Sequence, residues 1–416
     1  MFKIDKKTLT KYCSSIALVL VFFSTQVFGC KNLEYLIYIL PLFGVGALYT
    51  LWLVVKHLKD ALGLLKTPVF WWIIAMNVLI YIYGYVWGPF PVAYSRSSQL
   101  LIISHLMVMV MLLWVERDRV TEILPAAAVI MVAAETIYLI IHNSEAIRVM
   151  LSGGGLTRIG ETHNAGLIET SMTFSMCMIP MLLKLFSNRE KKYIIPVLIA
   201  LGVLVVDGSK VGILVVGATL LVIAIGLPKD KSFRRRNLII FIAVLVCVIL
   251  ITYIVPALRS AIFSRFKELV QVVFTMDTSD MQNSTSRRLY FALMALKKAW
   301  DRPFVGHGLL SFGVHMGFDW WEGVWPDAHN NAIELLYSCG LIGIAVYYWF
   351  PVYMIVRTIR ERYSVKKLAK VSLIFMMFFF DVSNISFQRN TIGYLAYTII
   401  FLLGVGISIR GEDYND

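Results

Sequence analysis

The chain consists of long apolar runs separated by short polar turns. Several runs exceed the roughly 18 residues that a helix needs to cross the hydrocarbon core of a membrane. They also lack the alternation of polar and apolar positions that is typical of transmembrane barrel strands. The pattern therefore predicts an all-α protein, a polytopic transmembrane helical bundle with about 12 spans. The predicted spans are 14–29, 33–55, 69–89, 97–115, 122–141, 163–186, 193–207, 210–227, 237–255, 332–356, 371–386 and 391–409.

Two segments between these spans are longer than simple turns, namely 142–162, which contains a glycine triplet, and 256–331. Loops held by a rigid scaffold often carry function. Within the longer segment, apolar residues recur at helical spacing over 286–300, which predicts an amphipathic helix lying on the bundle. We therefore divide the chain into transmembrane helices 1 to 9 over 1–255, a catalytic loop over 256–331 and transmembrane helices 10 to 12 over 332–416.

Composition and charge fix the class of protein and its predicted orientation. With 58% hydrophobic and only 16% charged residues, a chain of 416 residues has too few polar side chains to be a water-soluble globular protein. Lys and Arg number 25 on the side of the N-terminus and 14 on the other, or 6 once the long loop is left out. The positive-inside rule then predicts cytoplasmic termini and an extracytoplasmic loop. The same rule accounts for the net charge of +13, so no nucleic-acid partner is predicted.

Cations gather at the outer ends of the predicted spans, where the positive-inside rule does not require them. Such cations need a partner, and phosphate is a natural one because a guanidinium group binds it bidentately and stays charged. Snorkelling to lipid headgroups is the alternative for any single residue, but it explains a group of them less well. The cations are Arg158, Lys210, Arg287, Arg288 and Arg389.

One histidine stands immediately before the tenth predicted span, in the segment Pro-Asp-Ala-His329-Asn-Asn. Imidazole titrates near neutral pH, so His329 is a candidate general base that takes a proton from an attacking hydroxyl. The structural alternative is that Asn330 or Asn331 caps the following helix and His329 is only an interfacial residue. The sequence alone favours this structural alternative.

The sequence predicts neither a metal site nor a cofactor. It contains no HExxH pair, no Walker loop and no GxSxG elbow. The five cysteines are scattered without a paired spacing that would suggest a disulfide framework or a zinc site.

The order of these features resembles the superfamily of O-antigen ligases and polymerases. The resemblance is strongest from Arg288 to Tyr347, where an arginine and an amphipathic helix precede a Pro-x-x-Gly-x-Gly turn. A His-Asn pair and a Gly-hydrophobic-hydrophobic-Gly break follow. The turn is formed by Pro303, Gly306 and Gly308, and the break runs from Gly340 to Gly343. Two further elements look like family motifs, namely Arg158-Ile-Gly160 with His163-Asn164, and Gly208-Ser-Lys210. The second carries Lys where Arg is usual, which weakens the case for a bidentate phosphate contact there.

The resemblance implies a membrane glycosyltransferase of the GT-C type that is inverting and metal-independent. Its donor would be a glycan linked to undecaprenyl pyrophosphate, and its acceptor a second glycan or glycolipid. It would lie in the bacterial inner membrane among membrane lipids, with its site facing the periplasm or cell exterior. His329 would be the catalytic base. Substrate-binding residues would be Arg158, Arg288, Lys210, His163, Asn164, Asn330 and Arg389.

Three activities stay open within this interpretation. A polymerase extends a lipid-linked glycan, whereas a ligase transfers the glycan to lipid A core, and both need the same donor site. We favour the polymerase because it is the broader role. A transporter of the same lipid-linked sugars is the third possibility, but ionisable residues within the predicted spans are few and no internal repeat is present.

Overall fold

The computed structural model describes residues 5–28, 36–87, 93–151, 167–207, 209–226, 264–276, 278–280, 284–309, 311–317, 327–385 and 391–405, with eight isolated residues between 235 and 254. Every regular element in these ranges is a helix. The α-helices are α1 (Lys6–Phe28), α2 (Leu36–Lys56), α3 (Leu58–Leu62), α4 (Pro68–Tyr85), α5 (Ala93–Val115), α6 (Val120–His142), α7 (Ser144–Leu151), α8 (Leu167–Ser187), α9 (Ile194–Asp207), α10 (Lys210–Gly226), α13 (Ser264–Thr275), α14 (Ser284–Ala299), α15 (Ser311–His315), α16 (Asn331–Arg360), α17 (Val365–Ser383) and α18 (Thr391–Val405).

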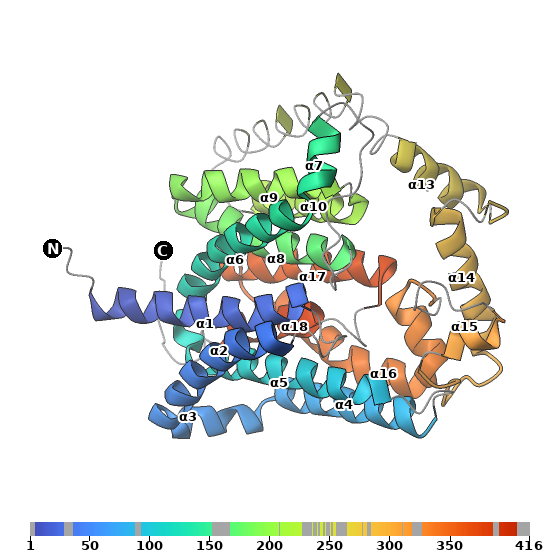
Figure 1. The fold of residues 1–416 in the computed structure, drawn as a ribbon, viewed down its shortest axis with the longest axis horizontal. Helices are drawn as coiled ribbons and strands as arrows, with labels where there is room; N and C mark the ends of the chain where they lie inside the picture. The colour runs from blue at the N-terminus through green and yellow to red at the C-terminus, as the bar shows by residue number, and fades with distance from the viewer. Residues whose placement is uncertain are drawn as a thin grey trace.

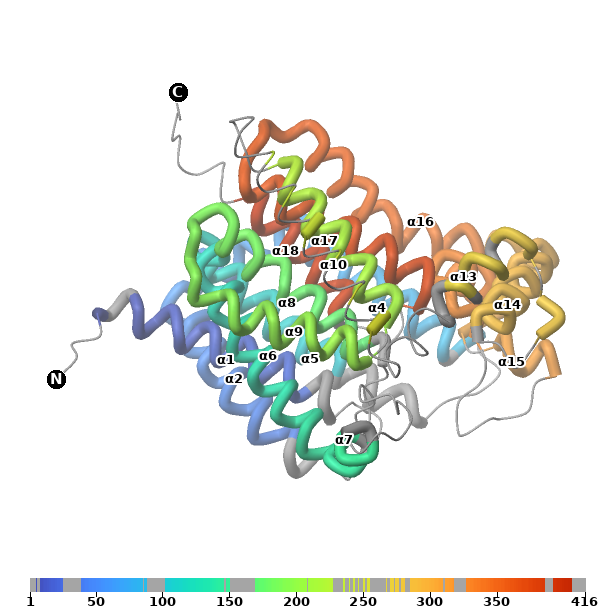
Figure 2. Tube along the Cα trace, turned by 90° about the horizontal axis from the view of Figure 1, so that it is seen from above, coloured from blue at the N-terminus to red at the C-terminus, as the bar shows by residue number. Residues whose placement is uncertain are grey.

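The long helices run side by side, and the helices of the predicted catalytic loop gather at one end of them. In Figure 1, α13, α14 and α15 stand at the right, beside the first turns of α16, whereas α1 begins at the left. The view from above in Figure 2 shows the same group of three helices outside the main bundle. The molecule is therefore polarised, with the loop helices at the end opposite the start of α1.

The predicted all-helical fold is confirmed, and eleven of the twelve predicted spans overlap a described helix. Segment 237–255 lies largely outside the described residues. By length and composition, four helices could cross a membrane: Ile39–Lys56, Arg117–His142, Glu169–Ser187 and Asn331–Arg360. A fifth candidate is the pair Leu58–Lys66 and Pro68–Gly84, which is bent by 63°. Other apolar helices have only 10–17 residues, so the count of 12 spans and the three-part division stay predictions.

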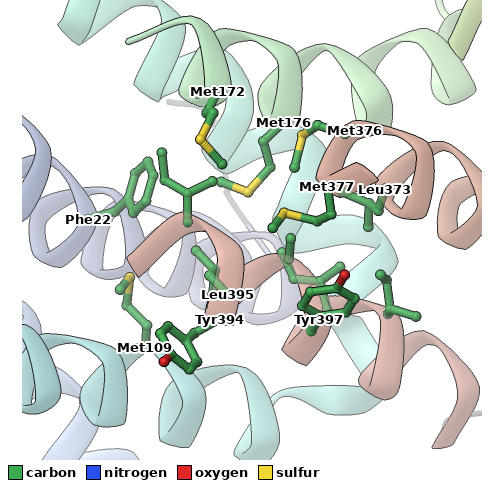
Figure 3. Packing of buried hydrophobic residues seen from close by; sticks show 14 of the residues in the cluster. Phe22, Met109, Met172, Met176, Leu373, Met376, Met377, Tyr394, Leu395 and Tyr397 are labelled. Atoms are coloured by element: carbon green, nitrogen blue, oxygen red, sulfur yellow. The ribbon is translucent and has the colours of Figure 1, made fainter. Parts of the chain in front are cut away.

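The centre of the bundle is packed with aromatic and sulfur-containing side chains. Met172 and Met176 of α8 and Met376 and Met377 of α17 belong to this core, and Figure 3 shows Met176 beside Met376. Methionine is unbranched and polarisable, so it fills irregular gaps between helices. This part of the core is consequently able to adapt its shape.

The predicted amphipathic helix over 286–300 corresponds to α14. Phe291, Ala295 and Ala299 follow one another at intervals of four residues and are buried, whereas Lys297 and Lys298 are exposed. The buried side chains pack against α15 and α16 in a small separate hydrophobic cluster. Helical periodicity in the sequence therefore correctly predicted which face of this segment is buried.

Helix α16 is broken at Gly340, where the backbone has φ 64° and ψ −162°. The turn 303–308 inserts its backbone at this break. The amides of His307 and Gly308 donate to the carbonyls of residues 337 and 338 at 2.9 Å each. In return, the amides of residues 341 and 342 donate to the carbonyls of Pro303 and Phe304 at 2.8 and 3.2 Å. The predicted glycine break is thus confirmed, and the turn satisfies the backbone groups that the break leaves without helical partners.

Candidate active site

His329 is held by a carboxylate two residues earlier in the chain. Its Nδ1 lies 2.6 Å from Oδ1 of Asp327, and its backbone amide donates to the same oxygen at 2.8 Å. Because a carboxylate accepts, Nδ1 carries the shared hydrogen and Nε2 is left as the proton acceptor of the neutral ring. Both side chains are about one-third exposed, at 31% and 32%. The pair therefore has the arrangement of an oriented base with access to a substrate.

The backbone at His329 is strained, with φ 48°, a value that residues other than glycine seldom adopt. Buried contacts hold the turn in place. Glu334, which is 1% exposed, accepts from the amide of Ala328 at 2.9 Å and from the hydroxyl of Ser338 at 2.8 Å. The strain is thus maintained by the surrounding structure, as is common at functional sites.

Asn330 caps α16 and also reaches the neighbouring helix. Its Oδ1 accepts from the amide of Ile333 at 3.0 Å, and its Nδ2 donates to the carbonyl of Val382 in α17 at 3.3 Å. The capping alternative for this residue is therefore present in the structure. His329 itself is oriented by Asp327.

Helix α14 connects the predicted cations with the histidine through Thr285, Arg288 and Phe291. Arg288 is three residues from each of the other two and so neighbours both on the helix surface. Lys210 Nζ lies 3.5 Å from Oγ1 of Thr285, and the Phe291 ring centroid lies 6.4 Å from that of His329. Arg288 stands between Thr285 and Phe291 in the helix and is partly buried. The fold thereby brings Lys210, Arg288 and His329 to one helix, although they lie far apart in the sequence.

Lys210 is positioned by the junction between α9 and α10. Asp207, the last residue of α9, is 3% exposed and accepts a hydrogen bond from the hydroxyl of Ser171 at 2.6 Å. Ser209 caps α10 by accepting from the amide of Gly212 at 3.1 Å. These buried contacts fix the first residue of α10, and with it the lysine, near the start of α14.

A polar cavity of about 480 Å³ lies at the other end of α14. His307 stacks on Tyr337 with ring centroids 4.6 Å apart, and Nδ1 of His315 lies 3.0 Å from the Tyr337 hydroxyl. Burial lowers the pKa of His315, and the neighbouring His307 and Arg302 lower it further, which favours the neutral form of its ring. The cavity is lined by Trp87, Lys298, Asp301, Arg302, His307, His315, Met316 and Tyr337.

Aromatic faces together with charged side chains of both signs are well suited to a ligand that has apolar faces and many hydroxyls. Along α14, Phe291 lies beside His329, and Lys298 lines the cavity seven residues later. At 1.5 Å per residue, the cavity is displaced by roughly 10 Å along the helix from the histidine. A ligand that contacts both places would have to span this distance.

Of the eight predicted site residues, four lie in the part of the chain that the structure describes and four lie outside it. Lys210, Arg288, His329 and Asn330 take the positions given above. Arg158, His163, Asn164 and Arg389 lie outside the described residues.

Sequence reasoning missed Asp327, Glu334 and the polar cavity. The Asp-x-His spacing could have indicated Asp327, because an Asp side chain readily bonds an amide two residues later. In the described part of the chain, no three His, Cys, Asp or Glu side chains come close enough to hold a metal ion.

Comparison with known proteins bears directly on this region. Residues 195–348 match the family model Wzy_C, described as O-antigen ligase. No curated protein matches the chain. The matched region includes α10, α14, nearly all of α9 and the broken part of α16, and with them Lys210, Arg288 and the His329–Asp327 pair. The match is limited to residues 195–348, where the chain is similar to the O-antigen ligase family, and it supports the resemblance seen in the sequence.

Proposed function

We propose that the protein is a membrane glycosyltransferase that moves an oligosaccharide from undecaprenyl pyrophosphate to a sugar hydroxyl and thereby polymerises surface polysaccharide repeats. The observation that carries this proposal is the convergence of Lys210, Arg288 and the His329–Asp327 pair along α14. The family match over 195–348 supports glycosyl transfer as the reaction.

The proposed chemistry is a single displacement. The bond between the anomeric carbon and the pyrophosphate oxygen breaks, and the leaving pyrophosphate takes the electron pair. Arg288 and Lys210 stabilise the negative charge that develops there. The acceptor hydroxyl attacks from the opposite face, which inverts the anomeric centre, and its proton passes to Nε2 of His329. No step requires a metal or a cofactor.

Arg158, His163, Asn164 and Arg389 are proposed to complete the donor site, on the basis of the sequence alone. Arg158 would share the pyrophosphate with Arg288. The amide of Asn164 and the imidazole of His163 would contact the glycan or the phosphate. Arg389 would add a further cation.

Glycan analysis of a deletion strain tests the function. We expect loss of the protein to leave single repeat units on the surface, because the repeats are no longer joined. Long glycans that stay lipid-linked and unattached would instead show a ligase. Surface glycan of unchanged amount and length, together with lipid-linked precursors of unchanged amount, would refute both activities.

We further propose that the chain lies in the bacterial inner membrane with α14 facing the periplasm or cell exterior, as the charge distribution predicts. We expect Asp280→Cys, at an exposed loop position, to react with a membrane-impermeant maleimide in whole cells. The matched variant Lys191→Cys, exposed between α8 and α9, should react only after lysis. The reverse labelling pattern would show that α14 faces the cytoplasm.

Arg288 should be essential for donor activation. Loss of one cation that stabilises the developing pyrophosphate charge typically costs about 3 kcal/mol in the transition state, so we expect Arg288→Ala to lower kcat roughly a hundredfold. Arg288→Lys should restore only part of the rate, because an ammonium group lacks the planar fork. Lys297→Ala, on the exposed side of the same helix, is the control and should leave kcat unchanged. Near-normal turnover by Arg288→Ala would show that Arg288 contacts lipid headgroups and does not activate the donor.

We propose that the polar cavity binds the glycan some distance from the reacting bond. Trp87→Ala should raise the KM for a long lipid-linked oligosaccharide about tenfold and change kcat less than about twofold, because the stacking contact lies away from the chemistry. Trp300→Ala removes an equally large exposed side chain that does not line the cavity, and its KM should stay normal. An equal effect of both substitutions would contradict a glycan subsite.

A further inference from the structure

A second cavity, of about 310 Å³, lies inside the bundle between α1, α6, α8, α17 and α18. Its walls are apolar and belong to the core itself. Met131, Met176, Leu373 and Leu395 line it, and each is at most 9% exposed. Figure 3 shows Met176, Leu373 and Leu395 meeting in this region. An apolar cavity of this kind is a poor site for water, which needs polar partners.

The charged side chains that line this cavity lie at one end of it. Lys184, Ser187 and Asn188 come from the last turn of α8 and the residue after it, and Lys366 comes from the first turn of α17. Lys184 Nζ is 3.9 Å from Glu190, but that carboxylate lies closer to Lys192, at 2.6 Å. Among the described side chains that line the cavity, two carry an ammonium group and none is a carboxylate, which favours an anion.

The depth of the cavity matches one leaflet of a membrane. The residues that line the cavity extend over seven positions along α17, from Lys366 to Leu373. Along α6 they extend over ten positions, from Thr121 to Met131. At 1.5 Å per residue these distances are roughly 10 and 15 Å. Half of the hydrocarbon thickness is about 15 Å. A single acyl chain that enters beside the two lysines would end near the centre of the bundle.

The mouth lies at the end of the molecule opposite the candidate active site. Asn330, next to His329, bonds the carbonyl of Val382, whereas Lys366 is sixteen residues earlier on the same helix, or roughly 24 Å away. From these observations we infer that the cavity binds an anionic phospholipid of the leaflet opposite the active site. One acyl chain fills the cavity and the phosphate contacts Lys184 and Lys366. This inference does not depend on glycosyl transfer.

Native mass spectrometry of the full-length protein from nanodiscs tests the inference. The discs contain equal amounts of phosphatidylglycerol and phosphatidylcholine, and the retained lipids are counted. Because each Lys near an anionic lipid surface favours binding severalfold, we expect the wild-type protein to retain phosphatidylglycerol about tenfold over phosphatidylcholine. The double variant Lys184→Ala/Lys366→Ala should lose this preference. The matched double variant Lys191→Ala/Arg362→Ala removes two exposed cations that do not line the cavity and should keep it.

Equal retention of the two lipids by the wild-type protein, or an unchanged preference in the Lys184/Lys366 variant, would overturn the inference. A second measurement on the unmodified protein avoids any dependence on folding of the variants. Phosphatidylglycerol with a photoreactive group at its acyl terminus should crosslink to peptides that contain Met131 or Leu373. Crosslinks confined to the lipid-facing outer surface would exclude an acyl chain in the cavity.

Discussion

We expect His329→Gln to lower the rate of glycosyl transfer by roughly a thousandfold while lipid pyrophosphate still binds with normal affinity. General base catalysis contributes about a hundredfold to ten-thousandfold to enzymatic rates. Glutamine keeps a hydrogen-bonding group near the same place but cannot take a proton. Since the proposed base acts on the acceptor hydroxyl, its loss should affect kcat far more than donor binding.

A substitution of the neighbouring carboxylate is a second, independent test of His329 as the base. Asp327 accepts from both Nδ1 and the backbone amide of His329, at 2.6 and 2.8 Å. Asp327→Asn can donate to Nδ1 and so favours the opposite tautomer, in which Nε2 carries the hydrogen and cannot accept the proton. We therefore expect a loss of about a hundredfold or more from this substitution as well.

Single-turnover transfer and donor binding are to be measured on the same purified samples. His57→Gln, the same substitution at an exposed histidine outside the site, should have no effect. If His329→Gln kept most of the wild-type rate, His329 would be an orienting group. The proton would then have to leave through another residue or through the departing phosphate.

The fold was largely predictable from the sequence because hydrophobic runs determine helices directly. Apolar residues at helical spacing correctly located α14, and the family resemblance indicated the break in α16, which the structure has at Gly340. What the sequence did not show is which segment fills that break. The contact between the turn 303–308 and the carbonyls of residues 337 and 338 joins backbone groups about thirty residues apart, and side-chain patterns carry no information about such pairing.

The candidate site was predictable in its residue types but not in its assembly. Cations and a histidine near helix ends indicated phosphate and proton transfer, yet only the structure relates Lys210 to His329, because both contact α14. The sequence did not reveal that Asp327 orients His329. An acidic residue before a helix is ordinarily explained as a helix cap or by its interaction with the helix dipole. The buried Glu334 was missed because a single Glu near a helix start is unremarkable until its burial is known.

The largest structural effect should come from Gly340→Ala. The backbone at this position has φ 64° and ψ −162°, a region that is essentially restricted to glycine. A Cβ there would lie 2.3 Å from the carbonyl carbon and oxygen of Phe304, which are backbone atoms and cannot rotate away. Accommodating alanine would require the turn 303–308 to withdraw from α16. The four backbone hydrogen bonds between the turn and α16 would then be weakened or lost.

Each of these hydrogen bonds contributes about 1 kcal/mol net, and the backbone strain adds about 1–3 kcal/mol, so we expect Gly340→Ala to lose about 4 kcal/mol or more of stability. This is a large part of the 5–15 kcal/mol that holds a typical protein folded. Fluorescence-detected size exclusion in detergent should show little monodisperse protein, and any remaining protein should have a clearly lower Tm. Gly202→Ala, within α9 and with no atom within 4 Å of the new Cβ, should keep a normal profile and a Tm equal to or above wild type. A monodisperse Gly340→Ala protein with the wild-type Tm would show that the turn does not pack at the break in α16.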